Sequence, residues 1–446
     1  MDGVRDHVVA LAVNVTMSSV ERVELAPGLS ISRVVTGMWQ IAELERHLPD
    51  GATLDPVATA AAMKPYVDAG LTSFDMADHY GSAEVIAGQF LRSNAGNAEV
   101  FTKICPKAGP VTRDDVRAAV ARARGRLGLD GGGGPIPLLQ LHTWAYWHPS
   151  SYLGALRHLA ELQREGAVGH VGLTNFDTAH LRIVLASGLK VVSNQVCYSL
   201  LDDRPARGGM AALCAEHGVQ LLCYGTLGGG LLTDRFLDEL RAQDPAPVAA
   251  APAAAAASPP GAPPTGRKMP SCKVQAPTAF PSIDDSDDSD GDGDDGGGGG
   301  GGGGGGSSGS GGSSAPVSAA DLRAELSGAS RVKRDEPTTW SMAKYQRFVD
   351  AAGGAKALRP VLEAARAVAD KHGVSLANVA VRWVLQRPSV AAAIVGARLG
   401  RTSHIADTLN VFKARRDSAE DFCRLKARRC TATDRIFIPA YCFALP

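Results

Sequence analysis

Four polar side chains lie where predicted strands end and loops begin. They lie in FDMADHYGSAE, VFTKICPK and LLQLHTW, and they are Asp75, Tyr80, Lys103 and His142. Such a set could protonate a carbonyl oxygen while a hydride reaches its carbon. A tyrosine has a pKa near 10 and releases its proton reluctantly at neutral pH unless the phenolate is stabilised. An ammonium about 4 Å away contributes roughly 4 kcal/mol at an effective dielectric of 20, or about three pKa units. We therefore expect Lys103 to make Tyr80 a proton donor.

The other two residues would support this pair. Asp75 would hold Lys103 charged and aimed, and His142 would donate a hydrogen bond to the carbonyl oxygen. Each residue alone has an ordinary alternative role. Asp75 could cap a helix, Tyr80 could be a half-buried loop aromatic, Lys103 a solvated cation and His142 a structural histidine. Their joint placement at successive strand ends favours the catalytic interpretation.

Short apolar runs alternate along the chain with segments of helical period. The runs are ISRVVTG, LTSFDMA, EVFTKI, PLLQLH, VGHVGLT, VVSNQV, VQLLCYG and AAAIVGA. Their continuous apolarity indicates burial on both faces, as in a parallel sheet covered by helices. Eight strand-helix units favour an α/β fold of the (β/α)8 TIM barrel type over an open doubly wound sheet. In such a barrel the strand ends that carry the polar set share one face.

Local signals predict several helix boundaries. Thr112 before RDDVRAAV and Asp177 before TAHLRIVL are expected N-caps. Three glycines follow helical segments as C′ residues would, and they are Gly166, Gly218 and Gly373.

The chain of 446 residues divides into five predicted parts. Residues 244–320 are Pro/Ala-rich, then Asp/Ser-rich, then Gly-rich, with too few large apolar side chains to offset the entropy of ordering them. We predict a long disordered insertion there, after strand 7 of the barrel, between barrel parts 20–243 and 321–413. Residues 1–19 form a leader and residues 414–446 a divergent, basic C-terminal tail.

Composition argues against several classes of partner. The formal net charge is zero, and without the acidic insertion the remainder is only slightly basic, so nothing indicates a nucleic-acid surface. No apolar run approaches membrane-spanning length. The eight cysteines are scattered, with neither a C-x-x-C pair nor a His-bearing zinc spacing. They predict reduced thiols in a cytoplasmic protein and no metal site. The oligomeric state is not indicated.

The motifs and their order resemble the aldo-keto reductase superfamily. They are D-x4-Y in DMADHY, then G-x-x-E, T-K-I, L-x-L-H, G-L-T-N-F and S-N-Q-V-x-Y-S, over the chain from Val20 to Phe412 outside the insertion. Each motif alone is weak, but this order on a predicted barrel is highly specific. The resemblance implies NADPH-dependent reduction of a small-molecule aldehyde or ketone, with Tyr80 as proton donor. No G-x-G-x-x-G follows the first strand, so no Rossmann module is expected.

The same resemblance implies an NADPH molecule extended across the barrel mouth. Polar residues matched to the nicotinamide carboxamide are Thr174, Asn175 and Gln195. Tyr224 matches the aromatic that stacks on the nicotinamide ring, and the backbone around Leu227 and Gly229 would approach the pyrophosphate. Gln195 at a strand edge and GGG as a simple turn are the structural alternatives.

The last strand and the following helix match the other end of the cofactor. Arg398 is the expected ligand of the 2′-phosphate, because a guanidinium offers a planar fork to a dianion. Arg401 and Ser403 would assist. Asp407-Thr408 stands where the family has a Glu/Asp-Asn pair, so the adenine contacts depart from the pattern. Arg398 as a surface charge is the alternative.

Aromatic residues on the loops would line the substrate pocket. The expected residues are Trp39, Thr143 and Trp144, with Trp147 as a further candidate. Trp39 could instead belong to the core.

A second function is also open: a regulatory or scaffold subunit with a reductase-like barrel that binds NADPH without turnover. The intact set of four polar residues favours turnover.

Overall fold

The computed structural model of the chain describes residues 20–49, 51–94, 96–106, 109–143, 146, 149–243, 339–351 and 353–413. Several predicted features lie outside the described residues, namely the leader 1–19, the insertion 244–320, the tail 414–446, Trp144 and Trp147.

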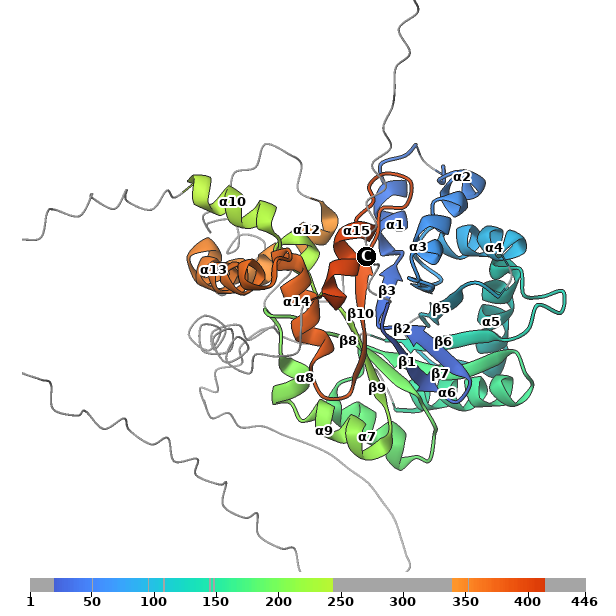
Figure 1. The fold of residues 1–446 in the computed structure, drawn as a ribbon. Coiled ribbons are helices and arrows are strands. Elements are labelled where there is room, and N and C mark those ends of the chain that lie inside the picture. Colours follow the sequence, from blue (N-terminus) through green and yellow to red (C-terminus); the bar gives the residue numbers. More distant parts are fainter. Residues whose placement is uncertain are drawn as a thin grey trace, which may run out of the picture. The chain divides into compact units, whose positions relative to one another are not determined.

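Eight parallel strands close into a barrel in which the last strand pairs with the first (Figure 1). In barrel order they are β3 (Val34–Gly37), β4 (Ser73–Asp75), β5 (Glu99–Ile104), β6 (Ile136–His142), β7 (Val168–Thr174), β8 (Ser193–Cys197), β9 (Gln220–Tyr224) and β10 (Val390–Gly396). Each predicted run contains one of these strands in whole or in large part, so the predicted (β/α)8 TIM barrel is confirmed.

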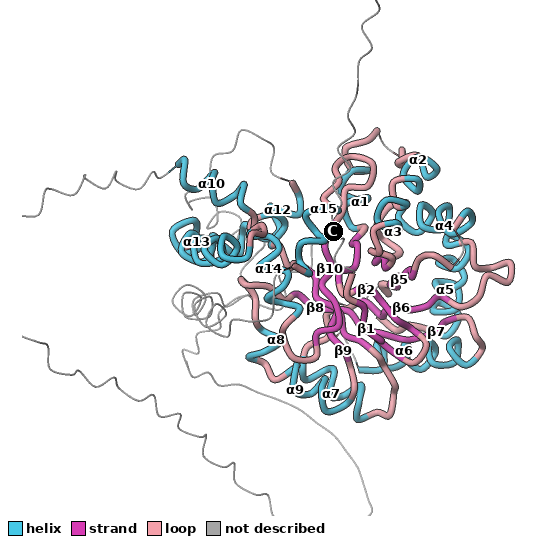
Figure 2. Tube along the Cα trace, viewed as in Figure 1, coloured by secondary structure: helices cyan, strands magenta, loops and turns pink. Residues whose placement is uncertain are grey.

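Helices surround the barrel strands (Figure 2). Those that follow the predicted helical segments are α2 (Pro56–Ala61), α3 (Lys64–Asp68), α4 (Ala83–Ser93), α5 (Arg113–Leu127), α6 (Pro149–Arg164), α7 (Thr178–Ala186), α9 (Met210–His217), α13 (Gly354–His372), α14 (Leu376–Leu385) and α15 (Ile405–Leu409). Thr112 forms a capping box at α5, and the Asp177 side chain accepts a hydrogen bond from the His180 amide at α7. Gly218 and Gly373 adopt left-handed C-cap conformations. These boundary predictions are confirmed.

A two-stranded antiparallel hairpin, β1 (Arg22–Ala26) and β2 (Leu29–Ser32), precedes the barrel and was not predicted. Gly28 adopts the left-handed conformation that its turn needs. Leu25 and Ile31 belong to an apolar cluster with Phe101 and Leu222 from the barrel strands. The hairpin therefore covers the amino-terminal end of the barrel, opposite the strand ends that carry the polar set.

Further helices lie outside the predicted pattern. They are α1 (Trp39–Glu45), α8 (Arg204–Arg207), α10 (Asp234–Gln243) and α12 (Trp340–Ala351), with the short 3-10 helices η1 (Gly228–Gly230) and η3 (Asn410–Phe412). The segment PVATAAAMKPYV has a helical period but is divided into α2 and α3, which are separated by Ala62 and Met63. Pro65 lacks the amide that would donate to the Ala61 carbonyl in a continuous helix. Residues 244–338 follow β9 and α10, so the barrel sequence is interrupted after its seventh strand, as predicted.

The register of neighbouring strands brings polar residues to one rim. Lys103 pairs with Gln140, His142 with Thr174, and Thr174 with Gln195. Because parallel strands end on the same side of a barrel, these residues meet at its carboxyl end.

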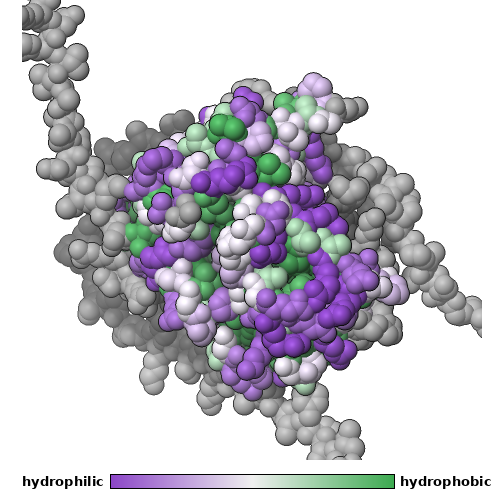
Figure 3. All heavy atoms as spheres, turned by 90° about the vertical axis from the view of Figure 1, so that its right-hand side faces the viewer, coloured by the Kyte–Doolittle hydropathy of each residue, from purple (hydrophilic) through white to green (hydrophobic). Residues whose placement is uncertain are grey.

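Hydrophilic residues cover much of the described surface on the face drawn in Figure 3, and hydrophobic residues lie among them in small groups. Within the described residues, no helix is both long enough and apolar enough to cross a membrane.

Candidate active site

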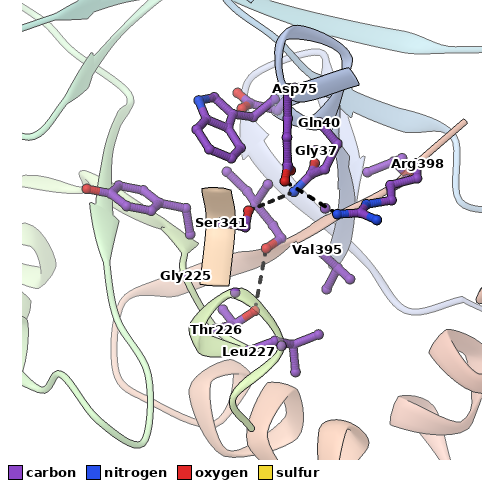
Figure 4. A pocket seen from close by; sticks show the side chains of 18 of the residues that line it. Gly37, Gln40, Asp75, Gly225, Thr226, Leu227, Ser341, Val395 and Arg398 are labelled. Carbon is purple, nitrogen blue, oxygen red and sulfur yellow. Dashed lines mark hydrogen bonds and ion pairs between the residues drawn. The ribbon is translucent and has the colours of Figure 1, made fainter. Parts of the chain in front are cut away.

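A cavity of about 1380 Å³ opens at the carboxyl ends of the barrel strands. Its wall includes strand-end residues such as Asp75 and His142, together with residues of α1 and α12. Figure 4 draws Gln40, Ser341 and Arg398 close together on one side of this cavity, with Leu227 on the other. The elements that meet here lie far apart in the sequence.

A buried ion pair lies at the base of the cavity. The Lys103 Nζ donates hydrogen bonds to Asp75 Oδ2 at 2.6 Å and to the Met76 carbonyl at 2.8 Å, and the Lys103 side chain is fully buried. Burial acts to lower the pKa of Lys103, but the Asp75 carboxylate and Tyr80 act more strongly together and raise it. Lys103 therefore stays charged at neutral pH.

Tyr80 lies on the turn after β4 with its ring beside this ion pair. The Lys103 Nζ is 4.8 Å from the centroid of the ring. Burial raises the pKa of Tyr80, Lys103 lowers it through its charge and through hydrogen bonding, and Asp75 raises it. Lys103 thus lowers the pKa of Tyr80, as expected from the sequence. Burial outweighs this effect, however, so the pKa of Tyr80 lies above its ordinary value rather than below it.

His142 is buried and contacts Asn175. Burial, followed by the charges of Lys103 and other neighbours, holds the pKa of His142 well below its ordinary value, so the ring is neutral. The Tyr224 hydroxyl donates to Asn175 Oδ1 at 2.8 Å, which turns Asn175 Nδ2 toward His142 Nε2 at 3.1 Å. Asn175 has a φ of 68°, a left-handed conformation that asparagine tolerates better than most residues. In this arrangement Nε2 of His142 accepts a hydrogen bond.

Gln140 connects several of the predicted residues and was not itself predicted from the sequence. Its Nε2 donates to Asp75 Oδ1 at 3.2 Å, and its Oε1 accepts from Gln195 at 3.1 Å and from Thr174 at 3.4 Å. Gln195 also donates to Asp75 Oδ1 at 2.8 Å. Gln140 precedes His142 by two positions, so both side chains point to the same face of β6. A single polar residue inside the apolar run PLLQLH was the available signal.

Helix α12 covers the loop that was expected to approach a pyrophosphate. Leu227 and Gly229 both line the cavity. A Cβ atom on Gly229 would collide with the Ser341 carbonyl oxygen, and one on Gly225 would collide with the Tyr345 hydroxyl. The glycines of this loop therefore allow the close approach of α12.

The same helix brings a cation to the predicted nicotinamide end. The Lys344 Nζ is 5.5 Å from the centroid of the Tyr224 ring and 5.7 Å from that of Trp39. Burial lowers the pKa of Lys344. Trp39 lines the cavity as expected and also stacks on Trp340 of α12, with ring centroids 4.9 Å apart. Thr143 is half-buried at the end of β6 and does not belong to the described cavity wall.

The residues expected at the phosphate and adenine end have protein partners. The Arg398 Nη2 lies 3.4 Å from Glu43 Oε1, a buried carboxylate oxygen that also accepts from the Trp340 amide. Glu43 Oε2 has no hydrogen-bond partner among the described residues. Both carboxylate oxygens of Asp407 accept hydrogen bonds at the start of α14, from Asn378 and from Ser375.

Two further residues at this end do not belong to the described cavity wall. Arg401 and Ser403 are exposed and are absent from the described cavity wall. The structure therefore groups Asp75, Tyr80 and Lys103 tightly. At the adenine end it places Arg398 and Asp407, but not Arg401 or Ser403, in the cavity wall.

Cysteines in the described part of the chain are free thiols, and they are Cys105, Cys197, Cys214 and Cys223. Cys105 borders the cavity, and burial raises its pKa to about 12.

Comparisons with known proteins agree with this fold. The Aldo/keto reductase family model matches residues 33–287 and 304–428. The 6-dehydroglucose reductase of Agrobacterium fabrum is 29% identical over 235 residues, which are 48% of this chain and 73% of that protein. The aldo-keto reductase yakc of Schizosaccharomyces pombe, named with NADP(+), is 29% identical over 195 residues, 40% of this chain and 55% of that protein.

A solved structure supports the same fold. The glycerol dehydrogenase of Gluconobacter oxydans superposes with a TM-score of 0.56 at 18% identity, covering 95% of this chain and 98% of that chain. With the family model matching most of the sequence, the chain belongs to the aldo/keto reductase family.

Proposed function

We propose that this protein is an oxidoreductase that reduces an aldehyde or a ketone to an alcohol, with NADPH as hydride donor and Tyr80 as proton donor. The observation that carries this proposal is the buried pair of Lys103 and Asp75 beside the Tyr80 ring. A buried ion pair is weak support for stability, because desolvation of both charges offsets their attraction. A chemical role explains its position better. The name of the Agrobacterium relative, a reductase of 6-dehydroglucose, supports carbonyl reduction.

Tyr80 and Lys103 divide the proton chemistry between them. NADPH, when bound, would supply the hydride that forms the new bond at the carbonyl carbon. The carbonyl oxygen then takes the proton of Tyr80, and the O–H bond of the phenol breaks. Lys103 stabilises the phenolate that is left, and Asp75 holds Lys103 in place through the 2.6 Å hydrogen bond.

His142 would orient the carbonyl group. A neutral imidazole carries one proton and can donate it to the carbonyl oxygen. Asn175 now donates to Nε2 of this ring. We propose that Asn175 exchanges this hydrogen bond for the nicotinamide carboxamide. The ring proton of His142 then moves from Nδ1 to Nε2, where it can be donated to the carbonyl oxygen.

The residues at the cavity fit a nicotinamide cofactor in part. Asn175 and Tyr224 present an amide and an aromatic ring to the cavity. Thr174 and Gln195 are already hydrogen-bonded to the Gln140 network, so they would hold the carboxamide less directly than expected. A pyrophosphate at Gly229 would need α12 to move away from the loop.

The preference for NADPH rests on Arg398 and is opposed by Glu43. A guanidinium attracts the 2′-phosphate, whereas the buried Glu43 carboxylate beside it repels a dianion. The relative named with NADP(+) favours NADPH. Both reduced cofactors are therefore included in the test below.

Nicotinamide absorbance with a panel of aldehydes and ketones tests the proposal. We expect the wild type to oxidise NADPH with at least one carbonyl compound, and Tyr80→Phe to lose about 10² to 10⁴-fold in kcat. Binding of NADPH by Tyr80→Phe, followed by fluorescence, separates lost chemistry from lost binding. Tyr152→Phe, which removes a hydroxyl outside the described cavity wall, is the control. If the wild type consumes neither NADPH nor NADH with any carbonyl, the proposal is wrong.

A further inference from the structure

Three side chains with metal-binding atoms converge on the wall of the cavity. His79 follows β4, Cys105 follows β5 and His142 ends β6. One ligand atom of each lies within 4.8 Å of the others, and all three residues line the cavity. The rings of His79 and His142 are stacked, with centroids 5.3 Å apart. We propose that His79, Cys105 and His142 form a binding site for a borderline-soft divalent metal ion, with Zn²⁺ as the representative ion.

The kinds of ligand select the class of metal. Zn²⁺ binds cysteine sulfur and histidine nitrogen at about 2.0–2.3 Å in a tetrahedral arrangement, which sets its ligand atoms about 3.5 Å apart. The present separations of up to 4.8 Å need a closure of roughly 1 Å. His79 is exposed and Cys105 is half-buried on a loop, so side-chain rotation can supply this closure. Mg²⁺ and Ca²⁺ prefer oxygen ligands and are not expected here.

Asp78 holds two of the three ligands in position. Its Oδ1 lies 2.8 Å from His79 Nδ1, and its Oδ2 accepts a hydrogen bond from the Cys105 amide at 3.0 Å. A carboxylate on one nitrogen of a histidine fixes the ring and leaves the other nitrogen for a metal. His79 would therefore bind the ion through Nε2, and the backbone amide of Cys105 is tied to the same carboxylate. This support distinguishes the cluster from a chance meeting of three side chains.

Binding is a ligand substitution without a redox change. The ion gains bonds to one nitrogen of each imidazole and to the Cys105 sulfur, and it loses water molecules from its hydration shell. At His142 the bond to the ion replaces the hydrogen bond that Asn175 donates to Nε2. The S–H bond of Cys105 breaks, and its proton passes to the buffer. The fourth position of a tetrahedral ion stays with water.

A bound ion would block the chemistry of the cavity. This consequence rests on the proposed function, in which His142 faces the carbonyl oxygen. An ion on His142 removes that donor and fills the space beside Tyr80. We therefore expect added Zn²⁺ to inhibit carbonyl reduction in competition with the carbonyl substrate, while binding of the ion itself does not depend on turnover.

Titration of the full-length protein with Co²⁺ tests the site, because a cobalt–thiolate bond gives a near-ultraviolet charge-transfer band. We expect this band in the wild type, its loss in Cys105→Ser, and at least tenfold weaker cobalt binding in His79→Ala. Cys214→Ser, which removes a buried thiol on α9, is the matched control and should keep the band. A missing band in the wild type, or a band that persists in Cys105→Ser, would overturn the site.

Inhibition by Zn²⁺ is measured separately as the ratio of activities with and without the ion. We expect this inhibition to weaken at least tenfold in His79→Ala and in Cys105→Ser. Equal inhibition in both variants and the wild type would refute the inhibitory role. If the protein reduces no carbonyl, the cobalt titration still decides the site, so failure of this inference and failure of the proposed function can be told apart.

Discussion

The pKa of Tyr80 is set by opposing effects of its position. Burial raises the pKa, and the Lys103 ammonium lowers it. A phenol must be protonated to reduce a carbonyl, so reduction is fastest below this pKa and slows as the pH rises through it. The raised pKa keeps Tyr80 protonated at neutral pH, and Lys103 stabilises the phenolate when the proton leaves.

Replacement of Lys103 by methionine tests this balance. We expect Lys103→Met to lower kcat by about 10²-fold or more, because the phenolate loses its cation. The pKa of Tyr80 should rise further, since the lowering effect of Lys103 is gone and Asp75 still raises it. The alkaline fall in kcat therefore moves to higher pH. Rates measured across the pH range for both proteins give this shift.

A second variant separates an effect on catalysis from an effect on folding. Lys103→Met leaves the Asp75 carboxylate buried without its cation, which costs about 3–5 kcal/mol of stability. The double variant with Asp75→Asn removes that charge and should have the same slow rate. An alkaline limb that stays in place or moves to lower pH would argue against the role of Lys103.

Gln140 holds the inner polar network together. We expect Gln140→Leu to lower the free energy of unfolding by about 1–3 kcal/mol, because Thr174 and Gln195 lose a buried partner. Urea denaturation gives the value. Asn97→Leu, at an exposed position between α4 and β5, is the control and should change it by no more than about 0.5 kcal/mol. Similar losses in the two variants would mean that the network adds no stability.

At the scale of single residues, the sequence predicts those whose position relative to a strand or to another motif residue is distinctive. Asp75, Lys103 and His142 were recognisable at the ends of apolar runs, and Tyr80 by its spacing from Asp75. Gln140 was missed because its role depends on which partners its side chain faces. The pairing of Arg398 with Glu43 was missed because these two residues are 355 positions apart in the chain.

Helix α12 is the element with the most direct bearing on the cavity. It packs its backbone against Gly229 and places Lys344 beside Tyr224. Because a pyrophosphate at this loop needs the same space, we expect saturating NADPH to increase hydrogen–deuterium exchange of the backbone amides in α12. Mass spectrometry of peptides from α12 and from α5, as an internal control, measures the change. Unchanged or slower exchange in α12 would show that the cofactor binds without displacing it.

Helices and strands with a strong hydrophobic pattern were predicted from the sequence, and those without one were missed. Barrel strands were predictable because burial on both faces requires a continuous apolar run. The hairpin β1–β2 was missed because its strands contain exposed positions and so form no continuous apolar run, and its second strand runs almost directly into β3. Helices α10 and α12 were also missed, and they flank residues 244–338 in the sequence.

On the scale of the whole chain, the barrel closes across the interruption after β9. Strand β9 pairs with β10, which follows residues 244–338 in the sequence. Arg241 of α10, before the interruption, donates to Glu363 of α13, after it, at 3.0 Å. The described barrel contacts therefore join the two parts of the chain directly.

Deletion of residues 244–320 tests whether the barrel needs the insertion. We expect the shortened protein to fold with a Tm within a few degrees of the full chain, because residues 321–338 remain as a linker. Thermal unfolding followed by circular dichroism gives the Tm. Loss of cooperative unfolding would contradict both the predicted disorder and the independence of the barrel.

Transfer of deuterium from NADPH labelled at the transferring position of its nicotinamide is the most direct test of carbonyl reduction. With the best substrate of the carbonyl panel, we expect one deuterium on the carbinol carbon of the product from the wild type. Tyr80→Phe should give the same label at a rate about 10² to 10⁴-fold lower. Oxidation of the labelled cofactor with no deuterium in the alcohol, or an equal rate in both proteins, would contradict the assigned chemistry.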